Sequence, residues 1–443
     1  MRVVLTREKT PAMMKSDEAI MTEVYPGYYD RFVCIADRCE DTCCAGWEID
    51  IDDASYDAYM RVGGDLGARL NACIKTYGEM NGDDSGYEEV YEQHGFVLTE
   101  DMRCPFLDEH NLCDLYKELG EEALCEVCTN TPRNYLEYRQ KDIGMVREIS
   151  VSASCPEAAR LIYGSAEPMT FVKKEVPDEP ETEISDEDAE DEARLGAFLR
   201  NVRDEAISIL QDRDKTLDVR IRLFLLHADA VQDAINDWES GESRLPETVS
   251  LDASRLGEDH TEKDHDADIY RHFLIRMGTY SGLASIGQVW AERMELLAES
   301  FVGEPVDHED NDEEGMGNPV YKGYKSIYLK ASDNLNKWLT NNGLLYLYEH
   351  LLVYYAFLLL NRSIDDYDYL GKAKLVILSY LMNRDMDAVI MFEKNSFEKK
   401  DREENARIYA REVEHAEENL ADLFEEILFE RAYDTKALIT LFA

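Results

Sequence analysis

The chain has little positive charge, no cysteine beyond Cys155 and no apolar run long enough to cross a membrane. Its longest apolar stretch, residues 344–360, is interrupted by Glu349 and His350 and falls short of the roughly 20 residues that a bilayer-spanning helix needs. We therefore expect a buried helix there. No apolar segment of signal-peptide length stands at the N-terminus, so the sequence predicts a cytoplasmic protein without a membrane partner.

Basic residues are scarce: 47 Lys and Arg stand against 94 Asp and Glu, a formal net charge of −47. Phosphate binding depends on Lys and Arg, so this balance argues against a nucleic-acid partner. A surface this acidic would steer a lysine-rich partner toward the chain. General solubility explains the same charge equally well.

Three familiar fingerprints are also missing. No Gly-x-Gly-x-x-Gly follows a predicted strand, so the usual Rossmann methyltransferase site is not indicated. The C-x3-C-x2-C pattern of radical enzymes fails because Cys39-x3-Cys43 is followed at once by Cys44. The alternation of strands and helices that builds a TIM barrel is not visible either.

The cysteines are confined to the first third of the chain. They form one group, Cys34-x4-Cys39-x3-Cys43-Cys44, a second group, Cys104-x8-Cys113-x11-Cys125-x2-Cys128, and the single residues Cys73 and Cys155. Thiols stay reduced in the cytoplasm, so such a cluster indicates metal binding rather than disulfides. We interpret Cys73 as an ordinary core thiol.

Thiolates are soft ligands that select zinc, copper(I) or iron–sulfur clusters. Only Cys125-x2-Cys128 has the spacing of a zinc knuckle. Side chains of the adjacent pair Cys43-Cys44 tend to point apart, and an iron–sulfur cluster tolerates such dispersed ligands better than a single ion. Iron–sulfur and zinc therefore both remain open, and buried structural thiols are the alternative to either.

The composition changes twice along the chain, which divides it into three parts. We predict a mainly α protein: an irregular, cysteine-rich, metal-binding N-terminal domain (1–170), a solvated acidic linker (171–193) and an all-helical C-terminal domain (194–443). Apolar residues at helical spacing begin at Leu195. The further helices that we expect cover residues 217–238, 269–277, 287–301, 324–339, 344–360, 372–382 and 407–429.

The cysteine motifs resemble those of a known family. Cys39-Glu40-Asp41-Thr42-Cys43-Cys44-Ala45-Gly46-Trp47, preceded by Arg31-Phe32-Val33-Cys34, is similar to the opening motif of flagellin lysine-N-methylases, the larger relatives of small "CxxCxxCC" cysteine-cluster proteins. The likeness continues through Cys104-Pro105-Phe106-Leu107-Asp108, Cys128-Thr129-Asn130-Thr131-Pro132-Arg133 and residues 150–160. Residues 209–213 and 412–415 match more loosely.

The resemblance implies an enzyme that moves methyl groups from S-adenosylmethionine to surface lysines of flagellin, with a [4Fe-4S] cluster in its cysteine domain. The cysteines on which the family pattern depends are Cys34, Cys39, Cys43, Cys44, Cys104, Cys113, Cys128 and Cys155. Which four would hold the cluster is not indicated. Arg133 is a candidate for the carboxylate of S-adenosylmethionine, or it braces a loop.

Methyl transfer needs a deprotonated lysine amine, whose ordinary pKa is about 10.4, so a base is expected. Glu48, Asp50, Asp52 and His415 are candidates, but a solvated strand edge and a structural histidine explain them as well, and no catalytic residue is assigned. The alternative function is a non-catalytic zinc- or iron-binding module joined to a helical protein-interaction domain. The sequence does not indicate the oligomeric state.

Overall fold

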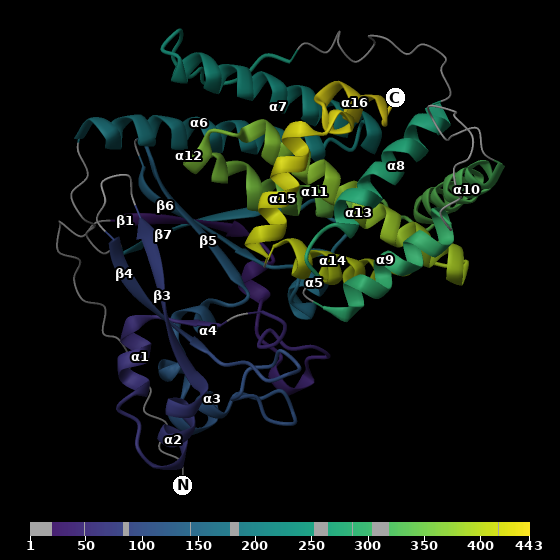
Figure 1. The fold of residues 1–443 in the computed structure, drawn as a ribbon. Helices are drawn as coiled ribbons and strands as arrows, with labels where there is room; N and C mark the ends of the chain where they lie inside the picture. The colour runs from purple at the N-terminus through teal and green to yellow at the C-terminus, as the bar shows by residue number, and fades with distance from the viewer. Residues whose placement is uncertain are drawn as a thin grey trace.

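The fold is that of a computed structural model, which describes residues 20–47, 49–82, 88–141, 143–177, 186–251, 265–285, 287–303, 319–414 and 416–443. The chain is mainly helical, with strands in its N-terminal part. Figure 1 shows the helices of the C-terminal part gathered together, with the two sheets below them.

The larger sheet has four strands in the order β5-β6-β1-β7. They are β1 Ile20–Pro26, β5 Arg133–Gln140, β6 Gly144–Val151 and β7 Phe171–Pro177. β1 pairs in parallel with β6, and the outer strands pair antiparallel. Val24 and Val146 are buried in the same hydrophobic core as the helices. This sheet therefore belongs to the helical core, although the sequence assigned it to a separate N-terminal domain.

Helix α6, Asp186–Leu210, lies against β5. Gly196 makes this approach possible, because a Cβ at this position would lie 2.1 Å from the carbonyl oxygen of Arg139. On the same helix Leu195, Phe198, Leu199 and Val202 are buried, so the predicted apolar stripe is confirmed.

The predicted linker, residues 171–193, is wrong at both ends. β7 pairs with β1 along its whole length, and Phe171 stacks on Phe357 with ring centroids 4.8 Å apart. An edge strand needs few apolar side chains once a neighbour satisfies its backbone. Helix α6 already begins at Asp186, where acidic residues favour a helix N-terminus. Residues 178–185 lie outside the described residues.

The smaller sheet has the order β2-β4-β3 and a core of its own. Its strands are β2 Asp50–Ile51, β3 Ile74–Gly82 and β4 Glu88–Phe96. The short helices around it are α1 Asp53–Tyr59, α2 Gly64–Cys73, α3 Asp114–Leu119 and α4 Glu126–Asn130, and α5 Pro156–Ile162 follows β6. The prediction of an irregular N-terminal part is therefore wrong, because this part contains two sheets. The sequence did not predict these strands, because β3 and β4 are largely polar and lack the alternation of apolar and polar residues.

The helical part surrounds two buried helices, α11 and α13. Its helices after α6 are α7 Leu217–Glu239, α8 His265–Ser281, α9 Gln288–Phe301, α10 Pro319–Asn341, α11 Tyr346–Leu359, α12 Ser363–Asp366, α13 Tyr369–Lys394, α14 Lys399–Val413, α15 Glu417–Phe429 and α16 Thr435–Thr440. The helix expected over 344–360 is α11, which is buried along nearly all its length, as predicted.

One predicted helix, over 407–429, is two. α14 ends at Val413, and the Asn419 side chain donates from Nδ2 to the carbonyl oxygen of Glu412, 2.9 Å away, which satisfies the end of that helix.

Within the described residues, no single helix has both the length and the apolar composition needed to cross a bilayer. Gly323–Asn341 and Tyr346–Asp366 meet that standard only as a pair, joined across a 101° bend.

Candidate functional site

The first cysteine group lies on a loop, residues 34–47, that runs between the smaller sheet and α14. Backbone hydrogen bonds hold its end: Cys104 N–H donates to Cys44 O at 2.9 Å, and Gly46 N–H donates to Met102 O at 2.7 Å. The Trp47 indole donates to Cys43 O at 2.7 Å. These bonds bring Cys44 to Cys104, which lies 60 positions further along the chain.

Three cysteines of the later motifs stand at helix N-termini. Cys113, Cys125 and Cys155 are the N-cap residues of α3, α4 and α5. Each is followed by an acidic residue in the first helical turn, and Pro156 occupies the first position of α5. Backbone N–H groups at a helix N-terminus favour a thiolate, because they carry partial positive charge.

Six cysteines pack on the core of the smaller sheet. One is Cys73, which ends α2, and we call the remaining five the core thiols: Cys44, Cys104, Cys113, Cys125 and Cys128. Burial, more than any other influence, raises the pKa of Cys104 to about 11, and Cys113 and Cys125 add to this. The hydrogen bond that Cys128 donates to Cys125 is the largest influence that raises the pKa of Cys128, and Cys44 and Cys104 contribute through their charge. The same hydrogen bond lowers the pKa of Cys125.

The other four, which we call the loop thiols, are Cys34, Cys39, Cys43 and Cys155. Burial raises the pKa of Cys155 to about 11, with further contributions from Cys39 and Cys43. Burial also raises the pKa of Cys39, and Cys34 adds a small part. A hydrogen bond with Cys44 is the largest influence that raises the pKa of Cys43. The two groups therefore meet at the adjacent pair Cys43-Cys44.

The thiols are the right type of ligand for a soft metal, but their side chains are not positioned around one ion. Sulfurs from distant segments gather in two neighbouring groups, which is the donor set that zinc or an iron–sulfur cluster requires. Across the part of the chain that the structure describes, however, no three His, Cys, Asp or Glu side chains are placed to hold one metal ion. A bound centre would therefore require new side-chain rotamers.

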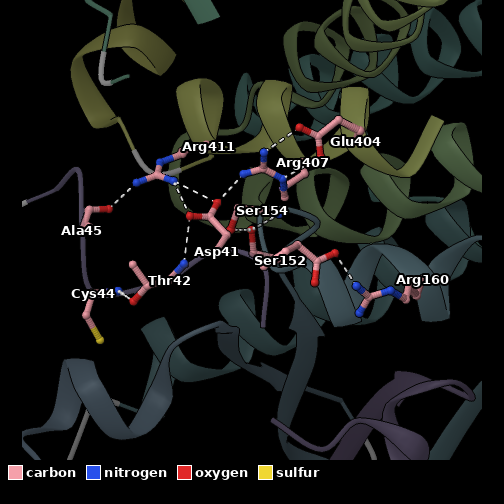
Figure 2. Close-up of polar contacts among 11 residues, drawn as sticks. Asp41, Thr42, Cys44, Ala45, Ser152, Ser154, Arg160, Glu404, Arg407 and Arg411 are labelled. Carbon is pink, nitrogen blue, oxygen red and sulfur yellow. Dashed lines mark hydrogen bonds and ion pairs between the residues drawn. The ribbon is translucent and has the colours of Figure 1, made fainter. Parts of the chain in front are cut away.

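The cysteine loop is fastened to α14 by a carboxylate between two arginines (Figure 2). Asp41 accepts from Arg407 and, at 3.1 Å, from Arg411, which lies one turn further along the helix. Arg411 also donates to Ala45 O. At least three-quarters of each of these three charged side chains is buried. The ion pairs therefore fix the loop against the helical part.

The backbone of the loop is shaped for this contact. Gly46 has φ +89°, and a Cβ there would lie 2.4 Å from the Arg411 guanidinium. On the other side of the loop, Arg160 of α5 pairs with Glu40 and, at 2.9 Å, with Glu157. In Figure 2 the Cys44 sulfur points away from the arginines.

A polar cluster around Glu414 lies next to the loop thiols. Glu414 follows α14, and its carboxylate accepts three hydroxyl hydrogen bonds: from Ser152 at 2.7 Å, Tyr354 at 2.9 Å and Tyr355 at 3.0 Å. Ser152 O in turn accepts from the N–H of Cys155 at 3.1 Å. Burial raises the pKa of Glu414 to about 7, although the three hydroxyl donors oppose the shift.

Two further tyrosines complete the Glu414 cluster. The hydroxyl oxygens of Tyr28 and Tyr163 are buried, and neither has a hydrogen-bond partner among the described residues. Burial raises the pKa of both tyrosines, with Glu414 contributing. Buried polar atoms without partners are rare in folded proteins and commonly mark a place for water or a ligand.

The bases and the arginine considered from the sequence lie elsewhere. Asp52 caps α1 and also accepts from Glu126 N–H at 2.9 Å, and Asp50 accepts from the Tyr77 hydroxyl at 2.7 Å. The Arg133 guanidinium lies 5.4 Å from the Phe32 ring centroid and donates to the Tyr29 hydroxyl at 3.1 Å. Its assignment to the carboxylate of S-adenosylmethionine stays a prediction.

Two of the predicted bases, Glu48 and His415, lie outside the described residues. Glu414 belongs to residues 412–415, which match the family only loosely, and the sequence alone did not indicate it as a functional candidate. The nearby Tyr354-Tyr355 pair on a buried helix was the available signal, because buried tyrosine hydroxyls need partners.

A cavity of about 810 Å³ contains none of these residues. It lies between α6 and α7, and Asp204, Glu205, His227 and Glu247 are among its lining residues. Its acidic lining suits a cationic group. We assign no role to it, because nothing in its geometry joins it to the thiols.

Comparison with known proteins identifies the family of this chain. The model of the FliB lysine N-methylase C-terminal domain matches residues 203–441, which is more than half of the chain. This range holds α14, Glu414 and both arginines that bind Asp41. No solved structure matches.

Among curated proteins, the lysine-N-methylase of Salmonella typhimurium is 28% identical over 161 residues, which make up 35% of this chain and 36% of that protein. The flagellar biosynthetic protein FliU of Salmonella muenchen is 29% identical over 159 residues, 35% of this chain and 84% of that protein. The lysine-N-methylase of Salmonella choleraesuis is 27% identical over 161 residues. The match thus spans about a third of the length of the two lysine-N-methylases.

Proposed function

Because the chain belongs to the FliB lysine N-methylase family, we propose that it is a protein-lysine N-methyltransferase that carries methyl groups from S-adenosylmethionine to surface lysines of flagellin. The names of its relatives support lysine methylation and a flagellar substrate. The observation that carries the proposal is the arrangement of α14. Arg407 and Arg411 of this helix, and Glu414 directly after it, face the cysteine-bearing segments.

In the proposed reaction the lysine nitrogen attacks the sulfonium methyl group. A nitrogen–carbon bond forms, the sulfur–carbon bond breaks with its electron pair going to sulfur, and a proton leaves the nitrogen. We assign Glu414 as the acceptor of that proton. A carboxylate whose pKa is about 7 is a better base at neutral pH than an ordinary one, and the Ser152, Tyr354 and Tyr355 hydroxyls fix its orientation.

We also propose that the thiols hold an iron–sulfur cluster, as the resemblance implies, with zinc as the alternative metal. The support is the gathering of soft ligands from distant segments of the chain. When bound, such a cluster would supply iron coordinated by these thiols. Asp41 and its arginines hold the cysteine loop in place.

The test is mass spectrometry of flagellin co-expressed with this chain. We expect methyl-sized mass increases on lysines, their loss in a Cys43→Ala Cys44→Ala variant and in Glu414→Gln, and their retention in Cys73→Ala and Glu418→Gln. Glu418 is an exposed residue of α15 and serves as a matched control. Unmodified flagellin with a folded wild-type chain would refute the proposal.

Metal analysis of anaerobically purified protein separates the enzyme from the alternative module. Iron together with acid-labile sulfide supports the cluster. Stoichiometric zinc with unmodified flagellin would instead support a non-catalytic metal-binding protein.

A further inference from the structure

A second cavity, of about 180 Å³, lies inside the helical part and is separate from the thiols and from Glu414. Helices α8, α10 and α13 and the residues after α16 enclose it. Its polar lining includes Arg276, Tyr328, Ser332, Asn336 and Arg384. Two guanidinium groups in one small cavity are unusual in a chain whose net charge is −47.

One of these two arginines is neutralised by its neighbours. Arg276 donates from Nε and Nη2 to Asp385 Oδ2 at 2.9 and 2.6 Å, and from Nη1 to His272 at 2.6 Å. The other oxygen of Asp385 accepts from the Tyr328 hydroxyl at 2.9 Å. Both oxygens of this carboxylate are therefore engaged.

Arg384 has no such partner. It makes no hydrogen bond or ion pair with any residue that the structure describes, and its Nε is buried. The buried arginines Arg203 and Arg402 are each paired with a carboxylate, Glu148 and Asp387, at 2.5 Å. Buried Arg200 donates to the Gln140 amide oxygen at 2.7 Å. Asp218 and Asp385 act on this partly buried arginine, Arg384, only through their charge, and neither accepts a hydrogen bond from it. Its N–H donors therefore remain available to an anion in the cavity.

We propose that this cavity binds a small oxyanion, a carboxylate or a phosphate, on Arg384. The planar guanidinium matches two oxygens of either group. Ser332 and Asn336, one turn apart on α10, supply neutral donors. Asp333 also lines the cavity, but its carboxylate pairs with Lys337 at 2.5 Å, so its charge is compensated.

The test is isothermal titration calorimetry of the full chain with inorganic phosphate and, separately, with acetate, at an ionic strength held constant with chloride. We expect one saturable site for one or both anions, and the stronger binder identifies the class. Arg384→Gln should weaken binding at least tenfold. Arg271→Gln, an exposed arginine of α8, should leave it unchanged.

A second variant covers the case in which Arg384→Gln does not fold. Asn336→Asp places a carboxylate inside the cavity, so it should abolish the phosphate and acetate responses and raise the melting temperature. Absence of saturable binding to the wild-type chain, or wild-type affinity in either cavity variant, would overturn the inference. The result does not depend on methyl transfer.

Discussion

Replacing Glu414 with Gln should change how the stability of the protein depends on pH. Burial raises the pKa of Glu414 from 4.5 to about 7 in the folded chain. Between these values the folded state keeps a proton that the unfolded state has released. The free energy of unfolding therefore falls as pH rises through this window and levels off above it.

The magnitude follows from the same two values. One pKa unit corresponds to about 1.4 kcal/mol, so the full loss is on the order of 3 kcal/mol, of which roughly 2.5 kcal/mol falls between pH 5 and pH 8. Gln has almost the same shape and does not titrate. Its substitution introduces a constant offset, because the Ser152 and tyrosine hydroxyls must adjust, but it removes this slope.

Urea denaturation at pH 5, 6, 7 and 8 measures the effect. The free energy of unfolding of the wild-type chain minus that of Glu414→Gln should decrease by about 2–3 kcal/mol across the series. Glu418→Gln, the exposed control, should follow the wild type in parallel. Parallel curves for wild type and Glu414→Gln, or a difference that grows with pH, would refute the assignment of a buried carboxyl with a raised pKa.

Three other substitutions probe the framework of the site. Asp41→Asn should lower the free energy of unfolding by about 2 kcal/mol in urea denaturation, because Arg411 would lose its carboxylate and Arg407 would keep only Glu404; an unchanged value would show that the pairs are not formed. Gly196→Ala should destabilise by roughly 1–3 kcal/mol through its collision with Arg139 O. Gly278→Ala, with open space around it on α8, should be neutral or slightly stabilising in the same assay, and equal losses in both would contradict the close helix–strand contact. Gly46→Ala places a side chain at a positive φ and against Arg411, so it should lower both the stability and the metal content of the purified protein. Elemental analysis measures the metal content, and a full metal content would show that metal binding does not depend on the shape of this loop.

The helical half was predictable because its stability depends on repeated apolar spacing. Leu195, Phe198 and Val202 carry that period in the sequence, and α11 is recognisable as buried from its composition alone. The family was recognisable from the order of the cysteine motifs, and the comparison confirmed it. The break between α14 and α15 was not predictable, because it depends on the hydrogen bond from the Asn419 side chain to the Glu412 carbonyl oxygen in the folded chain.

The candidate site was less predictable because partners distant in sequence create its chemistry. Glu414 is one acidic residue among 94, and only the fold brings Ser152 and Tyr354 to it. The unpaired state of Arg384 is likewise invisible before its neighbours are placed. The cysteines at helix N-termini had a local signal, since Cys155-Pro156-Glu157 and Cys113-Asp114 are typical helix beginnings.

The attachment of the cysteine loop through Asp41 bears on how this protein can be divided in the laboratory. Both arginines that hold the loop come from α14, more than 360 positions away, and the β5–β6 face needs α6 as its cover. A fragment cut before α6 would expose apolar sheet surface and lose the counter-ions of Asp41. We expect the cysteine-bearing third, expressed alone, to aggregate, so biochemical work on its thiols requires the intact polypeptide.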